Sequence, residues 1–146
     1  MSLSIVATTD TTAKAPAWLT LNKHNNLLYL TDGTTTGNGT VEVFRTSSTG
    51  ELTSLDHVEA LIDGAHSAFY ANGRALAVAH YSASALQTYK VDASGAITPL
   101  QTFTYTIDKE GPDGERLIES SCTNLWNEAV ASIDVEGEIF AVLFDQ

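Results

Sequence analysis

Hydrophobic and polar residues alternate along most of the chain in short runs that are rich in β-branched and aromatic residues. Clusters of Gly, Asn, Asp and Ser separate these runs, and no stretch of about 12 residues keeps the period of a helix. This pattern predicts an all-β protein. The expected strands are residues 4–9, 18–21, 27–31, 40–46, 52–59, 67–71, 75–79, 85–91, 97–105, 129–133 and 138–143.

The chain also repeats itself, and Gly-containing turns recur at matching places in the copies. A repeat of about 45 residues that holds four strands is the unit of a β-propeller blade. The aligned pairs are Trp18 with His66 and 28–30 with 76–78 at an offset of 48 residues, and 43–45 with 88–90 and 50–53 with 95–98 at an offset of 45 residues.

The repeat predicts a partial β-propeller of about two and a half to three four-stranded antiparallel blades in a single domain. Residues 1–61 form the first blade with an extra N-terminal strand, and residues 62–106 form the second. Residues 107–127 form a long acidic loop, and residues 128–146 form an incomplete third blade. A β-sandwich whose hairpins are similar by chance is the alternative.

Charge and composition narrow the function classes. The chain has 146 residues, with 7 Lys and Arg against 18 Asp and Glu, a net charge of −11 that opposes binding to nucleic acid. No apolar run approaches the roughly 18 residues of a membrane span, and the first residues lack the basic and apolar regions of a signal peptide. A single cysteine, Cys122, forms no internal disulfide. We therefore expect a cytoplasmic protein with neither membrane nor nucleic-acid partners.

Several segments resemble a known family. Pro16-Ala-Trp-Leu-Thr-Leu21, Leu27-Leu-Tyr-Leu-Thr-Asp32 and Thr40-Val-Glu-Val-Phe44 are similar to a blade of the seven-bladed lactonase propellers, which include 6-phosphogluconolactonases and fungal carboxymuconate cyclases. The resemblance implies cofactor-free action on small anionic lactones or muconate-like acids. The second repeat adds three matches: Gly64-Ala-His66 resembles the family's Gly-Pro-x-His, Ala79-His80-Tyr81 its Ala-Asn-Tyr, and Gly111-Pro-Asp-Gly-Glu-Arg116 its Gly-Pro-x-x-Glu-Arg.

The chain departs from the family pattern in two ways. The family continues from Glu-Arg into a Pro-His-x-His segment with a catalytic histidine, whereas this chain has no histidine after His80. Seven blades of about 45 residues also need roughly 300 residues, so one chain cannot close the ring. The flanks of its terminal blades would be exposed unless chains associate as a homo-oligomer. The alternative function is therefore a catalytically inactive propeller fragment that serves as a binding or scaffold module.

Five residues are candidates for a site on a small anionic metabolite. His66 begins an expected inner strand, and either its imidazole or the carboxylate of Glu119 is the candidate base that activates water. The guanidinium of Arg116 is the candidate group for holding the substrate anion. His80 and Tyr81 are candidate substrate-binding residues at a turn. Each has a structural alternative: packing for His66, His80 and Tyr81, an ion pair for Arg116, and a solvated surface charge for Glu119.

No cofactor or metal is expected. Asp108, Glu110 and Glu119 stand at positions 1, 3 and 12 of a calcium loop, but Pro112 and Asp113 break its pattern at positions 5 and 6. Cys122 has no downstream histidine to activate its thiol. The sequence also lacks a Gly-x-Ser-x-Gly elbow, a phosphate-binding loop and a dinucleotide fingerprint.

Overall fold

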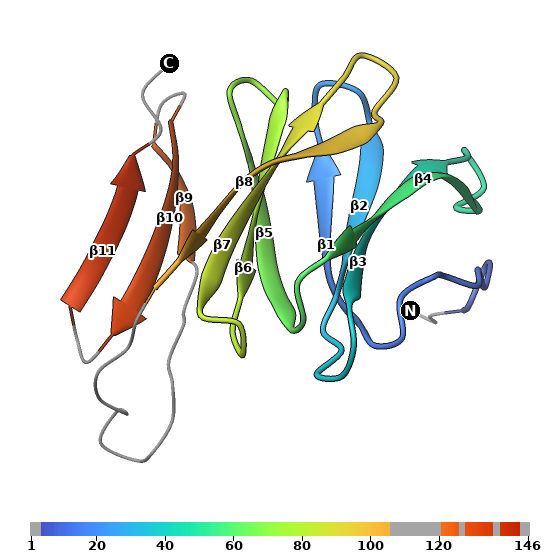
Figure 1. Cartoon of the computed structure of the whole chain (residues 1–146). Helices are drawn as coiled ribbons and strands as arrows, with labels where there is room; N and C mark the ends of the chain where they lie inside the picture. Colours follow the sequence, from blue (N-terminus) through green and yellow to red (C-terminus); the bar gives the residue numbers. More distant parts are fainter. Residues whose placement is uncertain (1–3, 106–120, 126–127, 136–137, 144–146) are drawn as a thin grey trace.

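Eleven strands in three antiparallel sheets make up the part of the chain that the computed structural model describes, namely residues 4–105, 121–125, 128–135 and 138–143 (Figure 1). Consecutive strands pair in order within each sheet, as in propeller blades. The first sheet contains β1 (Pro16–Asn22), β2 (Leu27–Asp32), β3 (Gly39–Thr46) and β4 (Leu52–Ala60). The second contains β5 (Gly64–Tyr70), β6 (Ala75–His80), β7 (Ala85–Val91) and β8 (Ile97–Thr104), and the third contains β9 (Ser121–Leu125), β10 (Glu128–Val135) and β11 (Glu138–Leu143).

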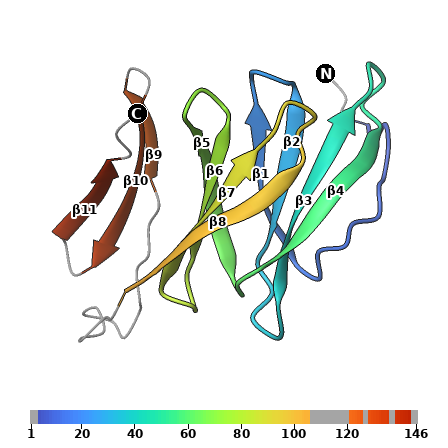
Figure 2. The same ribbon diagram turned by 45° about the horizontal axis from the view of Figure 1, so that its top comes forward.

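The three sheets stand side by side in chain order (Figures 1 and 2). The first strand of the first sheet, β1, contacts the first strand of the second, β5, and the last strands β4 and β8 contact each other. We therefore call β1 and β5 the inner strands and β4 and β8 the outer strands. Strand β10 of the third sheet contacts β5, which places that sheet on the other side of the second.

The main hydrophobic core lies between the first and second sheets. Successive side chains of a strand point to opposite faces, so alternate residues of each sheet enter this core. Tyr29 joins the two sheets: its ring meets that of Phe69 edge-on at a centroid distance of 4.9 Å, and its hydroxyl donates a hydrogen bond to the Gly95 carbonyl at 2.9 Å. The buried members are Leu27, Tyr29, Val41, Val43, Ala60, Leu76, Val78, Tyr89, Val91 and Ile97.

The structure confirms the predicted repeat at the level of the backbone. At the 48-residue offset, β1 and β5 each have a register shift just before Trp18 and His66 respectively. At the 45-residue offset, the β3–β4 and β7–β8 ladders each shift at equivalent positions. The turn glycines Gly50 and Gly95 both adopt positive φ, 88° and 93°. The β-sandwich alternative is wrong, because the sheets follow one another as blades.

Ten of the predicted strands are confirmed, and two predictions are wrong. Residues 4–9 form no strand, although they were expected to add one to the first blade. Strand β9 (Ser121–Leu125) lies inside the segment predicted as an acidic loop, so the third sheet begins before residue 128. Residues 106–120 of that segment lie outside the described residues. No described part of the chain is a helix with the length and hydropathy needed to cross a bilayer.

Candidate functional site

The inner strands β1 and β5 meet through hydroxyl groups. Thr20 donates to the backbone carbonyl of Ser67 at 2.9 Å, and the two hydroxyl oxygens lie 2.8 Å apart. At the far end of β1, the side-chain amide of Asn22 donates to the Gly73 carbonyl at 2.8 Å. These bonds fix the spacing of two strands that would line the central channel in a complete ring.

An aromatic pair bridges the same two strands. The Trp18 and His66 ring centroids are 4.4 Å apart, and the ring planes are tilted by 50°. Both residues follow a β-bulge, and bulges commonly redirect side chains next to functional sites. Trp18 keeps 42% of its surface exposed, whereas His66 is half-buried. The pair therefore offers an open indole surface beside an imidazole.

Partial burial sets the protonation state of His66. Desolvation penalises the charged imidazolium and lowers the pKa of His66 below 6.5. The imidazole is consequently neutral near pH 7, the form that can accept a proton. His66 lies in the inner strand where the sequence predicted it. Trp18, by contrast, was not among the candidate site residues, although its alignment with His66 marked the two positions as equivalent.

His80 lies inside the protein at the end of β6. It is buried, and its Nδ1 lies 3.1 Å from the Ile62 carbonyl, just before β5. Its Nε2 is buried without a partner among the described residues. Burial lowers the pKa of His80, so the ring is neutral near pH 7 and Nδ1–H is the donor. This environment favours the structural alternative for His80.

Tyr81 follows His80 in a turn. Its backbone N–H donates to the Asp63 carbonyl at 2.9 Å, and its half-buried ring packs with Ala79 and Tyr105. This packing also favours a structural role. The remaining candidates, Glu119 and Arg116, lie outside the described residues.

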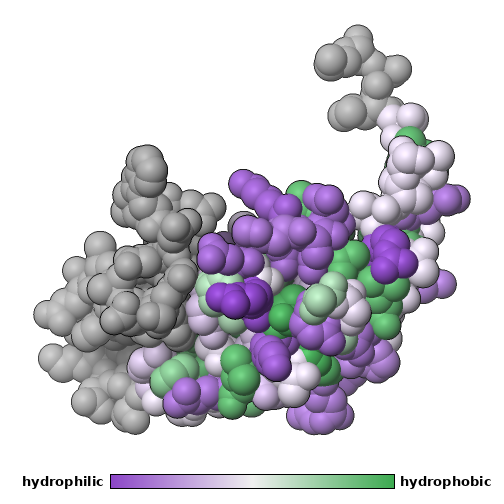
Figure 3. Space-filling model, turned by 90° about the horizontal axis from the view of Figure 1, so that it is seen from above, coloured by the Kyte–Doolittle hydropathy of each residue, from purple (hydrophilic) through white to green (hydrophobic). Residues whose placement is uncertain are grey.

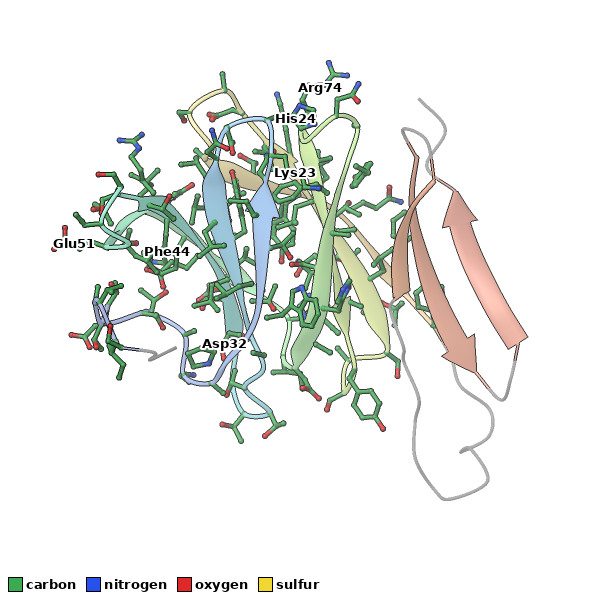
Figure 4. The ribbon with its side chains drawn as sticks, turned by 180° about the vertical axis from the view of Figure 1, so that it is seen from behind. Lys23, His24, Asp32, Phe44, Glu51 and Arg74 are labelled. Atoms are coloured by element: carbon green, nitrogen blue, oxygen red, sulfur yellow. The ribbon has the colours of Figure 1, made fainter. Side chains whose placement is uncertain are left out.

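Basic side chains gather at the opposite end of the inner strands. Figure 4 shows Lys23, His24 and Arg74 together where the β1–β2 and β5–β6 turns meet, far from Asp32 at the other end of β2. All three are exposed, and the His24 ring lies directly over Gly73. In a chain with a net charge of −11, Lys23 and Arg74 place two positive charges at this end.

No group of three or more His, Cys, Asp or Glu side chains in the described part of the chain is arranged to hold a metal ion. The face seen from above is mostly hydrophilic, with small hydrophobic patches between polar residues (Figure 3). Among the described residues, the arrangement suited to catalysis is the exposed Trp18 indole beside the neutral His66 imidazole. Basic side chains lie at one end of the same strands.

Comparisons with known proteins agree with this architecture. A family model described as "Lactonase, 7-bladed beta-propeller" matches residues 2–122. A periplasmic gluconolactonase of Pseudomonas aeruginosa is similar with a TM-score of 0.65 and 18% sequence identity, over 86% of this chain and 38% of that one. A protein from Lactobacillus plantarum is similar with a TM-score of 0.62 and 16% identity, over 90% of this chain and 42% of that one. A search of curated proteins found no match.

The chain therefore spans about two-fifths of the length of the solved structures that it matches. At identities below 20%, these likenesses establish the fold. They confirm the predicted fold class, a partial propeller built from antiparallel blades.

Proposed function

The chain belongs to the family of seven-bladed β-propeller lactonases, and from this premise we propose that it hydrolyses small anionic lactones at the inner strands β1 and β5. The observation that carries the proposal is the Trp18–His66 pair, with its exposed indole and half-buried imidazole. Phosphorylated sugar lactones such as 6-phosphogluconolactone are the first substrate class, and muconate-like acids are the second.

The two rings have complementary roles. The exposed face of the Trp18 indole packs against the apolar face of a small ring substrate. The neutral His66 imidazole accepts a proton from water as the water oxygen attacks the lactone carbonyl. When the acyl C–O bond of the ring breaks, the imidazolium returns that proton to the leaving alkoxide. The products are a hydroxyl group and a carboxylic acid, which releases its proton to solvent to become the carboxylate, so atoms and charge balance.

Charge brings the substrate to the strands. Lys23 and Arg74 attract an anion toward one end of β1 and β5, against a net charge that repels it elsewhere. Arg116 stays the candidate for holding the substrate's carboxylate or phosphate, and Glu119 stays the alternative base. Alanine variants of these two residues test each role separately from His66.

Replacing His66 by alanine is expected to lower kcat/KM for a δ-lactone by about a hundredfold, because a positioned general base contributes at least about that factor. The measurement is lactone hydrolysis above the buffer rate. His57→Ala is the matched control, since His57 is an exposed histidine on the outer strand β4 and should leave the rate unchanged. Equal rates for wild type and His66→Ala would remove His66 from the mechanism.

The pH profile gives a second prediction. Because burial lowers the pKa of His66, the imidazole stays deprotonated down to pH values below 6.5. We therefore expect kcat/KM to be flat from pH 8 to about 6.5 and to fall at lower pH as the base becomes protonated. An acid limb centred above pH 6.5 would assign the base to another group. The profile of His66→Ala should lack this limb.

The packing of two candidate residues favours a second candidate function. Because His80 is buried against the Ile62 carbonyl and Tyr81 packs with Ala79, the chain can serve as a non-catalytic binding or scaffold module that keeps the blade architecture. Absence of turnover above the buffer rate on both 6-phosphogluconolactone and muconolactone would select this module. Turnover that His66→Ala abolishes would select the enzyme.

A further inference from the structure

Thr31 connects the two bulged segments that carry the Trp18–His66 pair. It is fully buried on β2, directly opposite Trp18 in the β1–β2 ladder. Its hydroxyl donates to the Gly64 carbonyl on β5 at 3.2 Å and to the Trp18 carbonyl on β1 at 3.4 Å, a hydrogen bond shared between two acceptors. The bulge of β5 lies between Gly64 and His66. One hydroxyl group therefore ties the start of β5 to the part of β1 that presents the indole.

A second hydroxyl holds β5 on the other side of His66. The Thr20 hydroxyl on β1 meets the carbonyl and the hydroxyl of Ser67, the residue that follows His66, through the short contacts described above. The Ser67 side chain is buried, so water does not compete freely for this bond. Because Gly64 and Ser67 flank the bulge and the imidazole, the backbone that carries His66 is bonded to the first sheet both before and after it.

The close approach of the two sheets at Thr31 depends on a glycine. A Cβ atom at Gly64 would lie 3.1 Å from the Asp32 carbonyl oxygen and 3.4 Å from Cβ of Thr31. The first of these contacts is tighter than a side chain normally tolerates, so a larger residue would push β5 away from β2. Glycine at this position lets the Thr31 hydroxyl reach its acceptor on β5.

The two threonine hydroxyls are not a general feature of the repeat. At the 48-residue offset, Thr20 and Thr31 correspond to Ala68 on β5 and Ala79 on β6. Alanine has no hydroxyl group, so the second sheet lacks both of these donors. Packing that is common to both repeats does not account for them. The hydroxyls occur where the aromatic pair bridges two inner strands.

We propose that Thr20 and Thr31 are positioning residues for His66, and that their hydroxyls hold its imidazole beside Trp18 in the geometry that lactone hydrolysis needs. This inference rests on the function proposed above. Neither hydroxyl takes part in the proton transfer, which occurs between His66 and water. A general base must lie within hydrogen-bonding reach of the water that it deprotonates, and a misplacement of about 1 Å can lower a rate about a hundredfold.

The kinetic test replaces the Thr31 hydroxyl. Thr31→Val keeps the branched shape of the side chain and should lower kcat for 6-phosphogluconolactone about tenfold with little change in KM, because the substrate's own contacts remain. Thr31→Ser keeps the hydroxyl and should restore most of the rate. In the His66→Ala background, Thr31→Val should have no further effect, since it acts through His66.

Thr88→Val is the matched control. Thr88 is also buried, and its hydroxyl donates to the Gln101 carbonyl at 3.2 Å, between β7 and β8 of the second sheet. The substitution therefore removes an equivalent hydrogen bond that does not join the inner strands. We expect kcat to stay at the wild-type value.

Proton NMR of the imidazole measures the position of His66 without any turnover. At a centroid distance of 4.4 Å, the ring current of the indole shifts the imidazole C–H resonances, and Trp18→Leu should remove that shift. His66→Ala assigns these resonances. Thr20→Val and Thr31→Val should each move them toward their position in Trp18→Leu, whereas Thr88→Val should leave them in place.

The outcomes separate this inference from the proposed function. Wild-type turnover with a kcat that neither Thr20→Val nor Thr31→Val lowers would overturn the inference and leave the proposed function intact. Imidazole resonances that both variants leave in place would overturn it even where kcat falls, because the loss would not then arise from the position of His66. Absence of wild-type turnover would overturn the proposed function, and with it the catalytic role of the two threonines.

Discussion

Tyr29→Ala is expected to lower the free energy of unfolding by about 3–5 kcal/mol, the usual cost of truncating a fully buried aromatic ring. The ring is buried between the first two sheets and meets Phe69 edge-on, and its hydroxyl is bonded to the Gly95 carbonyl. Truncation leaves a cavity at the contact that holds the sheets together. Because small proteins have a total stability of about 5–15 kcal/mol, the loss can unfold much of the population. Urea denaturation measures it.

Tyr29→Phe separates the hydroxyl from the ring. It keeps the packing against Phe69 but leaves the Gly95 carbonyl without its donor and the Asn25 amide without its acceptor, so we expect a loss of about 1–2 kcal/mol. A loss for Tyr29→Ala that is no larger than this would contradict the view that Tyr29 joins the two sheets. A lower m-value in Tyr29→Ala would indicate that the sheets separate before they unfold.

The strands were largely predictable because their signals are local. Alternation and turn residues located ten strands, and two of them, at residues 85–91 and 138–143, agree with the structure at both ends. The two errors have a common cause, since strand formation depends on a pairing partner elsewhere in the chain. Residues 4–9 have the propensity but pair with no strand of the described sheets, whereas β9 has a polar sequence, Ser-Cys-Thr-Asn-Leu, and pairs with β10.

The site was predictable only in part. The repeat located His66 in an inner strand, but the exposure of Trp18 depends on how two bulged strands approach each other, which the sequence does not encode locally. The burial of His80 depends likewise on the chain that packs across the end of β6. Arg116 and Glu119 lie outside the described residues and stay predictions.

At the end of the second strand of each blade, a different residue holds the chain that leads into the inner strand. Asp32 and His80 are equivalent at the 48-residue offset, and both are buried against the chain that leads into the inner strand. The Asp32 carboxylate accepts backbone N–H groups of Lys14 and Ala15, whereas His80 meets the backbone carbonyl of Ile62. Backbone N–H donors face Asp32, so that position holds an acceptor. A backbone carbonyl faces His80, so that position holds a donor. A sequence alignment therefore cannot identify this shared role from residue type.

Asp32→Ala is accordingly expected to lower the free energy of unfolding by about 3 kcal/mol. The carboxylate accepts three backbone N–H groups, from Lys14 at 3.0 Å and from Ala15 and Thr34 at 2.9 Å. Hydrogen bonds to a charged group each contribute about 1.5–3 kcal/mol, but water can reach the exposed Lys14 and Ala15 once the side chain is removed. Chemical denaturation measures the loss. Asp32→Asn keeps one acceptor oxygen and should lose about half as much.

Asp92→Ala is the matched control for this effect. The Asp92 side chain also accepts backbone N–H groups, from Ser94 at 2.8 Å and Ala96 at 3.1 Å, but it lies in an exposed turn where water replaces the lost bonds. We therefore expect a clearly smaller loss than for Asp32→Ala. Equal losses would mean that the hydrogen bonds of Asp32 gain nothing from burial. A larger loss of unfolding free energy for Asp32→Ala would instead indicate that Asp32 fixes the start of β1. The position of Trp18 beside His66 would then depend on Asp32.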